Sequence, residues 1–307
     1  MISVLILTKN EEHDLSGCLD SVAWSDDVHV FDSLSSDATV SIARSRGAKV
    51  RQRPFDNYAA QRNAALHGLS FKHPWVLILD ADERIPEALR EEMLQCIVGA
   101  PVGVAAFRFR RRDFLGKTWL KRSQLSPWYI RLVQPDRVHY EREVNEILKV
   151  DGRIADLAQP FDHYPFSKGM AHWLAKHNTY STMEAQYIVR SRQSKPRFSI
   201  AQVFLNRDFN ERRYHQKELF YRLPGRPLIK FLLIYFVRLG FLDGRAGLIY
   251  ATLQSIYEYM IVLKTRELEN DDNFKVASAP EDSVHNANSD STGSLQKVIV
   301  VSKVSSR

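Results

Sequence analysis

The stretch Trp75-Val-Leu-Ile-Leu-Asp80-Ala-Asp82-Glu83 is an apolar run that ends abruptly in acids. Five consecutive apolar residues after a turn-prone His73-Pro74 are typical of a strand that is buried on both faces of a sheet. Asp80 and Asp82 are two residues apart, and side chains at this spacing point the same way on an extended chain. Because such hard oxygen ligands suit Mg²⁺ or Mn²⁺, the two acids are a candidate metal site. Two solvated acids in an ordinary turn remain the alternative.

Two earlier apolar strands also end in polar residues: residues 2–7 precede Thr8-Lys-Asn-Glu-Glu12, and residues 28–31 precede Asp32. Segments with helical spacing of apolar residues separate the strands. This alternation over the first hundred residues predicts an α/β fold, a mostly parallel sheet flanked by helices. Ligands of such sheets bind at the carboxyl ends of the strands. The polar residues expected at those ends are Thr8, Asn10, Asp32, Asp80 and Asp82.

Two common nucleotide-binding motifs are absent from the sequence. A dinucleotide-binding unit would place G-x-G-x-x-G directly after the first strand, but residues 8–12 contain no glycine. A P-loop is absent too. We therefore expect a nucleotide to be held by side chains and a metal, without a glycine-rich loop.

The composition favours a folded intracellular protein with an anionic partner. The chain has 307 residues, 44% of them hydrophobic, and a net charge of +7, which allows a sizeable core but does not say which anion binds. Cys18 and Cys96 lie in apolar-periodic segments and are expected to be reduced core residues, as in the cytosol. The first residues lack the features of a signal peptide. Because no apolar run reaches roughly 18 residues, we expect no membrane-spanning helix.

Four short motifs follow one another in the first hundred residues. They are Val4-Leu-Ile-Leu-Thr-Lys-Asn-Glu-Glu12, Asp32-Ser-Leu-Ser-Ser-Asp37, Gln61-Arg-Asn-Ala-Ala65 and Leu79-Asp-Ala-Asp-Glu83. In this order they resemble the motifs of family 2 glycosyltransferases of the GT-A fold, most closely the bacterial branch that contains the lipopolysaccharide-core β-1,4-glucosyltransferases. The resemblance extends to about residue 265. It implies an inverting transfer from a nucleotide-diphosphate sugar, usually a UDP-sugar, with a divalent metal.

The resemblance implies roles for residues near the first two strands. Thr8, Asn10 and Glu11 would line the nucleotide pocket. Asp32 would accept the imide N–H of the base. These positions match the family motifs residue by residue, so the roles are carried over with them.

Further roles follow for the charged residues that would meet the diphosphate. Arg62 would approach the nucleotide, Asp80 would face the ribose or the metal, and Asp82 would bind the metal. A metal with a nearby arginine stabilises charge on a departing diphosphate without protonating it. Arg131, inside an otherwise apolar strand, is either a structural ion-pair partner or a contact of the diphosphate. His163, in a His-Tyr pair that resembles the family's, is either a metal or diphosphate contact or a packed histidine.

An inverting transfer also needs a carboxylate that takes the proton of the acceptor hydroxyl. Three acids compete for this role, Glu141, Glu143 and Glu146. The family pattern is Val-His-Glu before a leucine, and Val144-Asn-Glu146 resembles it with Asn in place of His. We therefore expect Glu146 to be the base, with Glu141 as the alternative.

The composition divides the chain into four regions. Residues 1–100 are expected to form the nucleotide-sugar-binding half and residues 101–195 the acceptor-binding half of one catalytic domain. Residues 196–268 read as a basic and apolar helical extension. Residues 269–307 are rich in Asn, Asp, Ser and Ala and predict a disordered tail.

The extension contains an almost wholly apolar segment, residues 228–242, after a stretch rich in Lys and Arg. A basic amphipathic segment of this kind favours contact with an anionic membrane surface. Packing on the catalytic domain, or on a second copy in a homodimer, is the alternative. No recognised nucleic-acid-binding fold accompanies it, so we expect no nucleic-acid partner.

Together these features predict a metal-dependent inverting glycosyltransferase. It would move a hexose, with glucose favoured, from a UDP-sugar to a lipopolysaccharide-core, exopolysaccharide or other lipid-linked acceptor. It would act in the cytoplasm, peripherally associated with the inner face of the cell membrane. Two other hypotheses are a sugar-nucleotide nucleotidyltransferase, which usually has a glycine-rich loop after the first strand, and a non-catalytic membrane-surface binding protein on the same scaffold.

Overall fold

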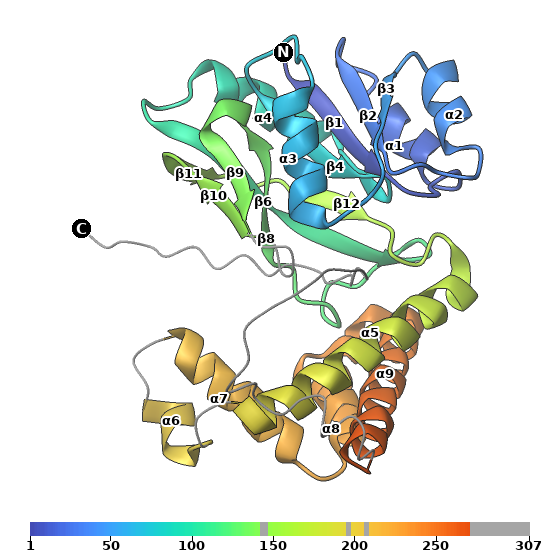
Figure 1. Ribbon diagram of the computed structural model, residues 1–307, viewed down its shortest axis with the longest axis vertical. Helices are drawn as coiled ribbons and strands as arrows, with labels where there is room; N and C mark the ends of the chain where they lie inside the picture. The colour runs from blue at the N-terminus through green and yellow to red at the C-terminus, as the bar shows by residue number, and fades with distance from the viewer. Residues whose placement is uncertain (142–146, 195–197, 206–208, 271–307) are drawn as a thin grey trace, which may run out of the picture. The chain divides into compact units, whose positions relative to one another are not determined.

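The computed structural model describes residues 1–141, 147–194, 198–205 and 209–270 (Figure 1). The chain divides into two compact units, of which the first is Met1–Met170 and the second begins at Ala171. Glu146, the expected base, lies outside the described residues. So does the expected disordered tail from residue 271 onward.

The parallel half of the first unit's sheet has the strand order β3-β2-β1-β4. Its strands are β1 (Ser3–Thr8), β2 (Val28–Asp32), β3 (Lys49–Gln52) and β4 (Val76–Asp80). In the register of these strands Thr8 is opposite Asp32, and Leu7 is opposite Asp80. The carboxyl ends therefore meet at one edge, as predicted from the sequence.

The other half of the sheet is mixed. Its order continues from β4 as β8-β6-β12-β5, with β7 and β11 also paired to β6. The strands are β5 (Glu83–Arg84), β6 (Val104–Leu115), β7 (Thr118–Trp119), β8 (Trp128–Val133), β11 (Arg153–Asp156) and β12 (Phe161–His163). Because β12 pairs with both β5 and β6, His163 lies opposite Glu83 on one side and Asp113 on the other.

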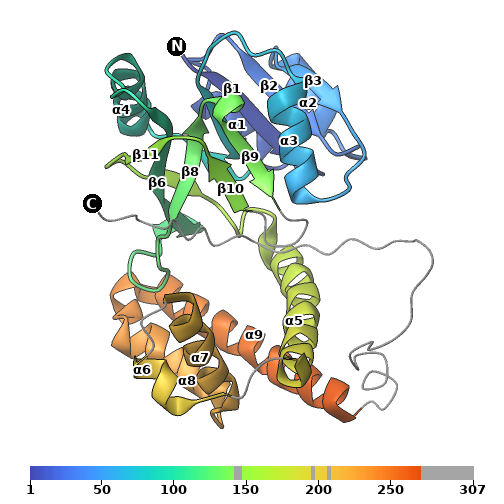
Figure 2. The ribbon, with the colours of Figure 1, turned by 60° about the vertical axis from the view of Figure 1, so that its left-hand side comes forward.

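Alternate residues of the central strands face two separate cores. Val4 and Leu77 pack in a cluster with residues of α1 and α4, whereas Leu5 and Ile78 pack in a cluster with residues of α3. The helices of this unit are α1 (Leu15–Ser21), α2 (Thr39–Ser45), α3 (Tyr58–Gly68) and α4 (Glu87–Val98), with a 3-10 turn at Pro135–Arg137. Helices thus cover both faces of the sheet (Figures 1 and 2), and the predicted α/β fold class is confirmed.

A small hairpin lies beside α3 and closes one core. It consists of β9 (Val138–Glu141) and β10 (Ile147–Val150), and Tyr140 and Leu148 join the same apolar cluster as Ala65 of α3.

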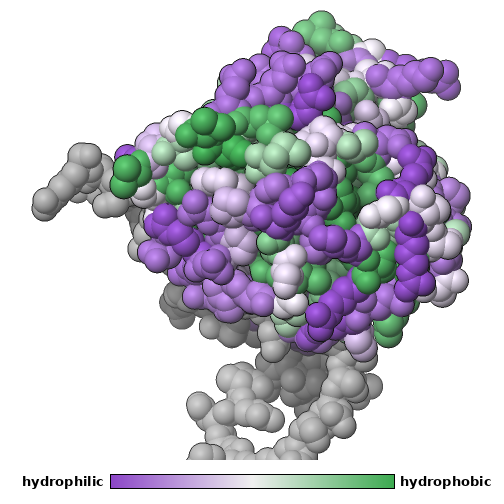
Figure 3. Space-filling model, turned by 90° about the horizontal axis from the view of Figure 1, so that it is seen from above, coloured by the Kyte–Doolittle hydropathy of each residue, from purple (hydrophilic) through white to green (hydrophobic). Residues whose placement is uncertain are grey.

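Figure 3 shows one face of the molecule, on which hydrophilic side chains surround smaller apolar areas. Cys18 is buried, Cys96 is partly buried, and both are free thiols.

The second unit is helical in its described residues. Its elements are α5 (Gly169–Ser194), α6 (Ile200–Leu205), α7 (Phe209–Arg222), α8 (Arg226–Leu232), a π-helix (Leu233–Val237), a 3-10 helix (Gly240–Asp243) and α9 (Gly244–Asn270). Ile188 of α5, Tyr221 of α7 and Ile261 of α9 form its core. Because α5 contributes to this core, the units divide at Met170, whereas the sequence favoured a boundary near residue 195.

The last helical stretch, Gly240–Asn270, has 31 residues and a window with a mean hydropathy of 1.2. By length and composition alone it could cross a membrane, although a third of that window is buried inside the protein. We expected no such helix, because no run of apolar residues is long enough. The difference arises because polar residues, Gln254 and Glu258 among them, interrupt the run, while the apolar residues around them keep its mean hydropathy favourable.

We predict that Asn63 of α3 holds the β9 strand in place. Its Nδ2 donates to the carbonyl oxygen of Tyr140 and its Oδ1 accepts from the Tyr140 amide, both at 2.8 Å. Replacing Asn63 with Ala leaves two backbone groups unpaired, at about 1–3 kcal/mol each, so we expect the free energy of unfolding in urea to fall by roughly 2 kcal/mol or more. Asn63→Asp keeps the acceptor but turns a carboxylate oxygen toward the Tyr140 carbonyl oxygen, so it should also be less stable than the wild type. Equal stability of Asn63→Ala and the wild type would contradict this role.

Candidate functional site

The nucleotide-side residues meet where β1 and β2 end. Thr8 Oγ1 donates to Asp32 Oδ1 at 2.9 Å. Asp32 also accepts from the Ser35 amide at 2.8 Å, from Ser35 Oγ at 2.5 Å and from Gln52 Nε2 at 2.9 Å. The structure therefore brings Thr8 and Asp32 together.

The Asp32 carboxylate is fully buried and richly hydrogen-bonded. Burial alone would raise its pKa, but the hydrogen bonds from Ser35, Gln52 and Thr8 outweigh burial and lower the pKa. A carboxylate has about four acceptor positions, and protein donors fill as many here. To accept a base N–H, as the resemblance implies, Asp32 would have to release one of these donors. That role stays a prediction.

Asn10 joins the loop after β1 to the loop after β2. Its backbone has a positive φ of 54°, a conformation that Asn tolerates better than most residues. Its side-chain Oδ1 accepts from the Ser36 backbone amide at 2.9 Å, and its backbone amide donates to Ser35 Oγ at 2.8 Å. The Glu11 amide donates to Thr39 Oγ1 at 2.7 Å. These bonds keep both loops at the same edge of the sheet.

The side chain of Glu11 is largely buried, with 20% of it exposed. Its Oε1 pairs with Lys168 Nζ at 2.7 Å, and Lys168 also donates to the Asn10 carbonyl at 2.9 Å. Burial raises the pKa of Glu11 to about 7 despite Lys168, and the nearby charges of Asp82 and Asp14 act in the same direction. Glu11 is thus within electrostatic reach of Asp82, the second acid of the Asp-x-Asp pair.

Asp80 faces two arginines. Arg131 Nη2 lies 3.0 Å from Asp80 Oδ2, and Arg62 Nη2 lies 3.5 Å from Asp80 Oδ1. Arg131 also pairs with buried Glu83 at 2.5 Å, and the Asp80 amide donates to Glu83 Oε2 at 3.0 Å. Desolvation opposes ionisation of Asp80, but Arg131 and Arg62 outweigh it and lower the pKa. Arg131 is therefore a buried ion-pair partner.

Asp82 faces a histidine that comes from a distant part of the chain. Its Oδ2 lies 3.1 Å from His163 Nε2, and 25% of its side chain is exposed. His163 Nδ1 lies 2.5 Å from Asp113 Oδ1, and Arg111 Nε lies 3.0 Å from the same oxygen. Asp113 thereby holds the imidazole ring in a fixed orientation.

These two donors fit a divalent metal. Neighbouring ligands of an octahedral ion with bonds of roughly 2.0–2.1 Å are about 3.0 Å apart, close to the 3.1 Å between Asp82 Oδ2 and His163 Nε2. A ligating histidine usually gives its other ring N–H to a carboxylate, and Asp113 supplies one. Within the described residues, no group of three or more His, Cys, Asp or Glu side chains could hold a metal by itself. A metal here would complete its shell with diphosphate oxygens.

Of the three acids that compete for the role of base, two lie outside the described residues. These two are Glu143 and Glu146. Glu141 ends β9 with an exposed side chain, 3.7 Å from Lys149 Nζ. The choice of base stays a prediction.

Three residues that support the site were missed by sequence reasoning. Asp113 orients His163, Lys168 pairs with Glu11, and Ser167 Oγ donates to Asp14 Oδ2 at 2.7 Å. Lys168 and Ser167 follow His163-Tyr164 closely, and this proximity was a usable signal. No feature of the sequence pointed to Asp113, because its contact with His163 depends on which strand lies beside β6.

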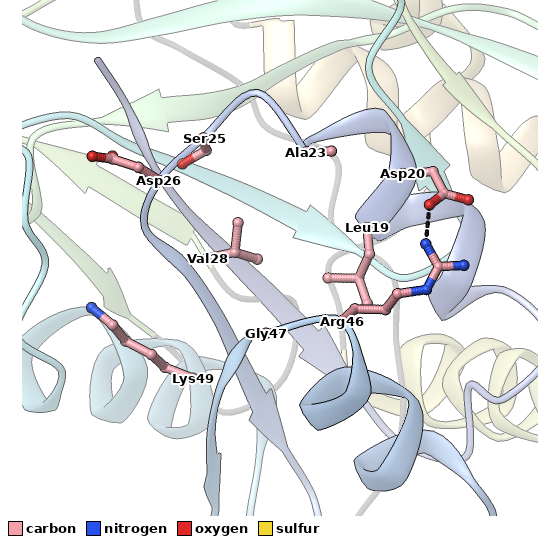
Figure 4. A pocket seen from close by; sticks show the side chains of 9 residues that line it. All are labelled: Leu19, Asp20, Ala23, Ser25, Asp26, Val28, Arg46, Gly47 and Lys49. Carbon is pink, nitrogen blue, oxygen red and sulfur yellow. Dashed lines mark hydrogen bonds and ion pairs between the residues drawn. The ribbon is translucent and has the colours of Figure 1, made fainter.

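A shallow hollow lies at the opposite edge of the sheet, where β2 and β3 begin (Figure 4). Its volume is about 330 Å³, and its lining includes Val28, Lys49 and the Asp20–Arg46 ion pair. It contains none of the candidate site residues. Its lining is a mixture of paired charges and apolar groups, so it does not point to a ligand.

Comparison with known proteins agrees with the sequence motifs. Residues 3–153 match the family model described as glycosyl transferase family 2. The lipopolysaccharide core biosynthesis glycosyltransferase LpsC of Rhizobium meliloti (strain 1021) is 27% identical over 271 residues, which cover 86% of this chain and 91% of LpsC. An uncharacterized glycosyltransferase of Rickettsia bellii (strain RML369-C) is 41% identical over 93 residues, which are 30% of this chain and 31% of that protein.

A solved structure also matches part of the chain. Glucosyl-3-phosphoglycerate synthase from Mycobacterium tuberculosis, in complex with Mn²⁺, UDP and glucosyl-3-phosphoglycerate, gives a TM-score of 0.40 at 17% identity, over 53% of this chain and 71% of that one. The family assignment rests on the sequence matches and not on this likeness. Residues 3–153 therefore match glycosyl transferase family 2, and the chain as a whole resembles the lipopolysaccharide-core branch of that family.

Proposed function

We propose that the protein transfers a hexose, glucose in the first instance, from a UDP-sugar to a lipopolysaccharide-core or other lipid-linked glycan, with inversion and with a divalent metal. The observation that carries the metal-dependent part is the 3.1 Å pair of Asp82 and His163 at the carboxyl edge of the sheet. The acceptor class is supported by the resemblance to LpsC, whose name describes lipopolysaccharide core biosynthesis. The donor is supported by the motifs of residues 4–83.

The charges of the site suit a departing diphosphate. Asp82 and His163 would hold the metal, which would offset the negative charge that develops on the leaving group. Arg62 lies beside Asp80 and stacks over the Tyr140 ring at 5.3 Å, so its cation is held close to the same place. Asp80 is already paired with arginines, and its role as ribose contact or metal ligand stays a prediction. Glu146 would take the proton of the acceptor hydroxyl.

We predict that Asp82→Asn removes the metal-dependent part of UDP binding. The wild type should bind UDP at least about tenfold more tightly with Mn²⁺ than without it, since even the groups that support a metal ligand are worth about 10–100-fold in metal affinity or activity. Asp82→Asn should bind UDP equally with and without Mn²⁺, and UDP release from UDP-sugars should fall to background. Calorimetry and a UDP-release assay measure the two effects.

Asp162→Asn is a matched control, because Asp162 is next to His163 in the chain but pairs with Arg112 at 2.5 Å. It should keep the metal-dependent gain in UDP affinity. If Asp82→Asn kept that gain as well, the metal assignment would be wrong. If the wild type ignored UDP both with and without Mn²⁺, a non-catalytic binding protein would be favoured.

The second unit carries an exposed apolar segment that supports membrane contact. Eight large apolar side chains of residues 228–242 are exposed, and four of them are more than half exposed: Leu228, Phe236, Val237 and Leu242. Lys230, Arg238 and Arg245 lie in or beside this segment. Apolar groups that enter a bilayer, with cations at the level of anionic headgroups, are typical of peripheral association. We propose that the segment binds the cytoplasmic face of the membrane; contact with a second copy is the competing use.

We predict that Phe236→Ser with Val237→Ser weakens binding to vesicles of phosphatidylglycerol and phosphatidylcholine by at least about tenfold, because burying each such side chain is worth about 1.5–3 kcal/mol. Co-sedimentation measures the effect. Val98→Ser with Val102→Ser is the control, since these valines of the first unit are 87% and 96% exposed. If the serine variants of residues 236 and 237 bound vesicles normally but changed from dimer to monomer in light scattering, the segment would be a dimer interface.

A further inference from the structure

The outer side of β6 carries three arginines in a row. Arg108, Arg110 and Arg112 alternate along the strand with buried residues, which include Phe109 and Asp113. Alternate residues of a strand point to the same side and are about 6.6 Å apart. The three guanidinium groups therefore share one side of β6, opposite the side on which Asp113 holds His163.

Aromatic rings support these cations. The Arg108 and Arg110 guanidinium groups lie 5.2 and 4.9 Å from the centre of the Trp128 ring. Arg112 lies 5.7 Å and Lys121 Nζ 5.4 Å from the centre of the Trp119 ring. The cation–aromatic face consists of Arg108, Arg110, Arg112, Trp119, Lys121 and Trp128.

The face has more cations than acids to pair with them. Arg108 pairs with Asp156 at 2.6 Å and Arg112 with Asp162 at 2.5 Å. Arg110 and Lys121 are exposed, and within the described part of the chain neither has a carboxylate at ion-pair distance. Residues 108–128 contain seven Lys and Arg but one acid, Asp113.

An arginine that stacks on an aromatic ring keeps its N–H donors, whereas an arginine in an ion pair uses some of them on the acid. Stacking on Trp128 restricts the Arg110 side chain but leaves the N–H groups on the edge of the guanidinium free to bind. Those donors match the two oxygens of a carboxylate or phosphate. A row of such cations suits a chain that carries several anionic groups.

We infer that the cation–aromatic face binds an acidic glycan, through carboxylate or phosphate groups on its sugars. This inference rests on the proposed function, because the glycan would be the anionic part of the acceptor. The face is connected to the candidate metal site through one strand pair: Arg112 is opposite Asp162, and the next residues, Asp113 and His163, are opposite each other. An acceptor anchored on the face is thus held by the same two strands that position His163.

Binding of oligogalacturonate, compared with its methyl ester, tests the inference. Both probes have the same sugar rings, and esterification removes the charge. The wild type should bind oligogalacturonate more tightly than the ester, and added NaCl should weaken the binding. Arg110→Gln with Lys121→Gln should weaken it at least about tenfold, since a hydrogen bond to a charged group is worth about that factor. Arg90→Gln with Lys72→Gln is the control of equal charge change, because these two cations lie outside the face and pair with Glu87 and Asp26.

Three outcomes would overturn the inference. Equal affinity for the acid and its ester would show that charge is not recognised. Equal loss in the control pair at Arg90 and Lys72 and in the pair at Arg110 and Lys121 would show that only net charge matters. Binding to phosphatidylglycerol vesicles that depends on Arg110 and Lys121, without binding to oligogalacturonate, would assign the face to the membrane. UDP titration of the wild type tests the proposed function separately, so a failure there is distinguishable from a failure of the glycan site.

Discussion

A buried arginine holds the carboxyl edge of the first unit together. Arg131 lies within 3.0 Å of Asp80 and 2.5 Å of Glu83, at the end of the central strand β4. Without it, the buried carboxylate of Glu83 would face the partly exposed carboxylate of Asp80, and a buried charge without a partner costs several kcal/mol. Because Arg131 belongs to β8, which runs antiparallel to β4, its ion pairs also join the parallel half of the sheet to the mixed half.

The two acids of the Asp-x-Asp pair consequently have different surroundings. Asp80 faces Arg131 and Arg62, whereas Asp82 faces His163. Spacing along an extended chain suggested that the two acids converge on one target, but β4 ends at Asp80 and a turn follows. The first acid therefore already has cations beside it. The second has the imidazole nitrogen of His163 3.1 Å away.

Much of the fold could be predicted because it depends on local patterns. Apolar runs located β1, β2 and β4, and helical spacing of apolar residues indicated the helices between the strands. The boundary near residue 195 differed, because the apolar side of α5 fits either unit until its partners are known, and Ile188 packs with Tyr221 and Ile261. The sequence likewise showed that residues 228–242 are mostly apolar, but it did not show that many of their side chains are exposed.

The sequence alone established which strands end in Thr8, Asp32 and Asp80, because backbone periodicity and polarity are properties of consecutive residues. Tertiary structure alone established that Arg131 neutralises Asp80, that Asp113 orients His163 and that Lys168 reaches Glu11. Each of these pairs joins residues at least 50 positions apart, and their contacts depend on strand order and register. Electrostatic interactions act through space, so their partners become known only when the sheet is assembled.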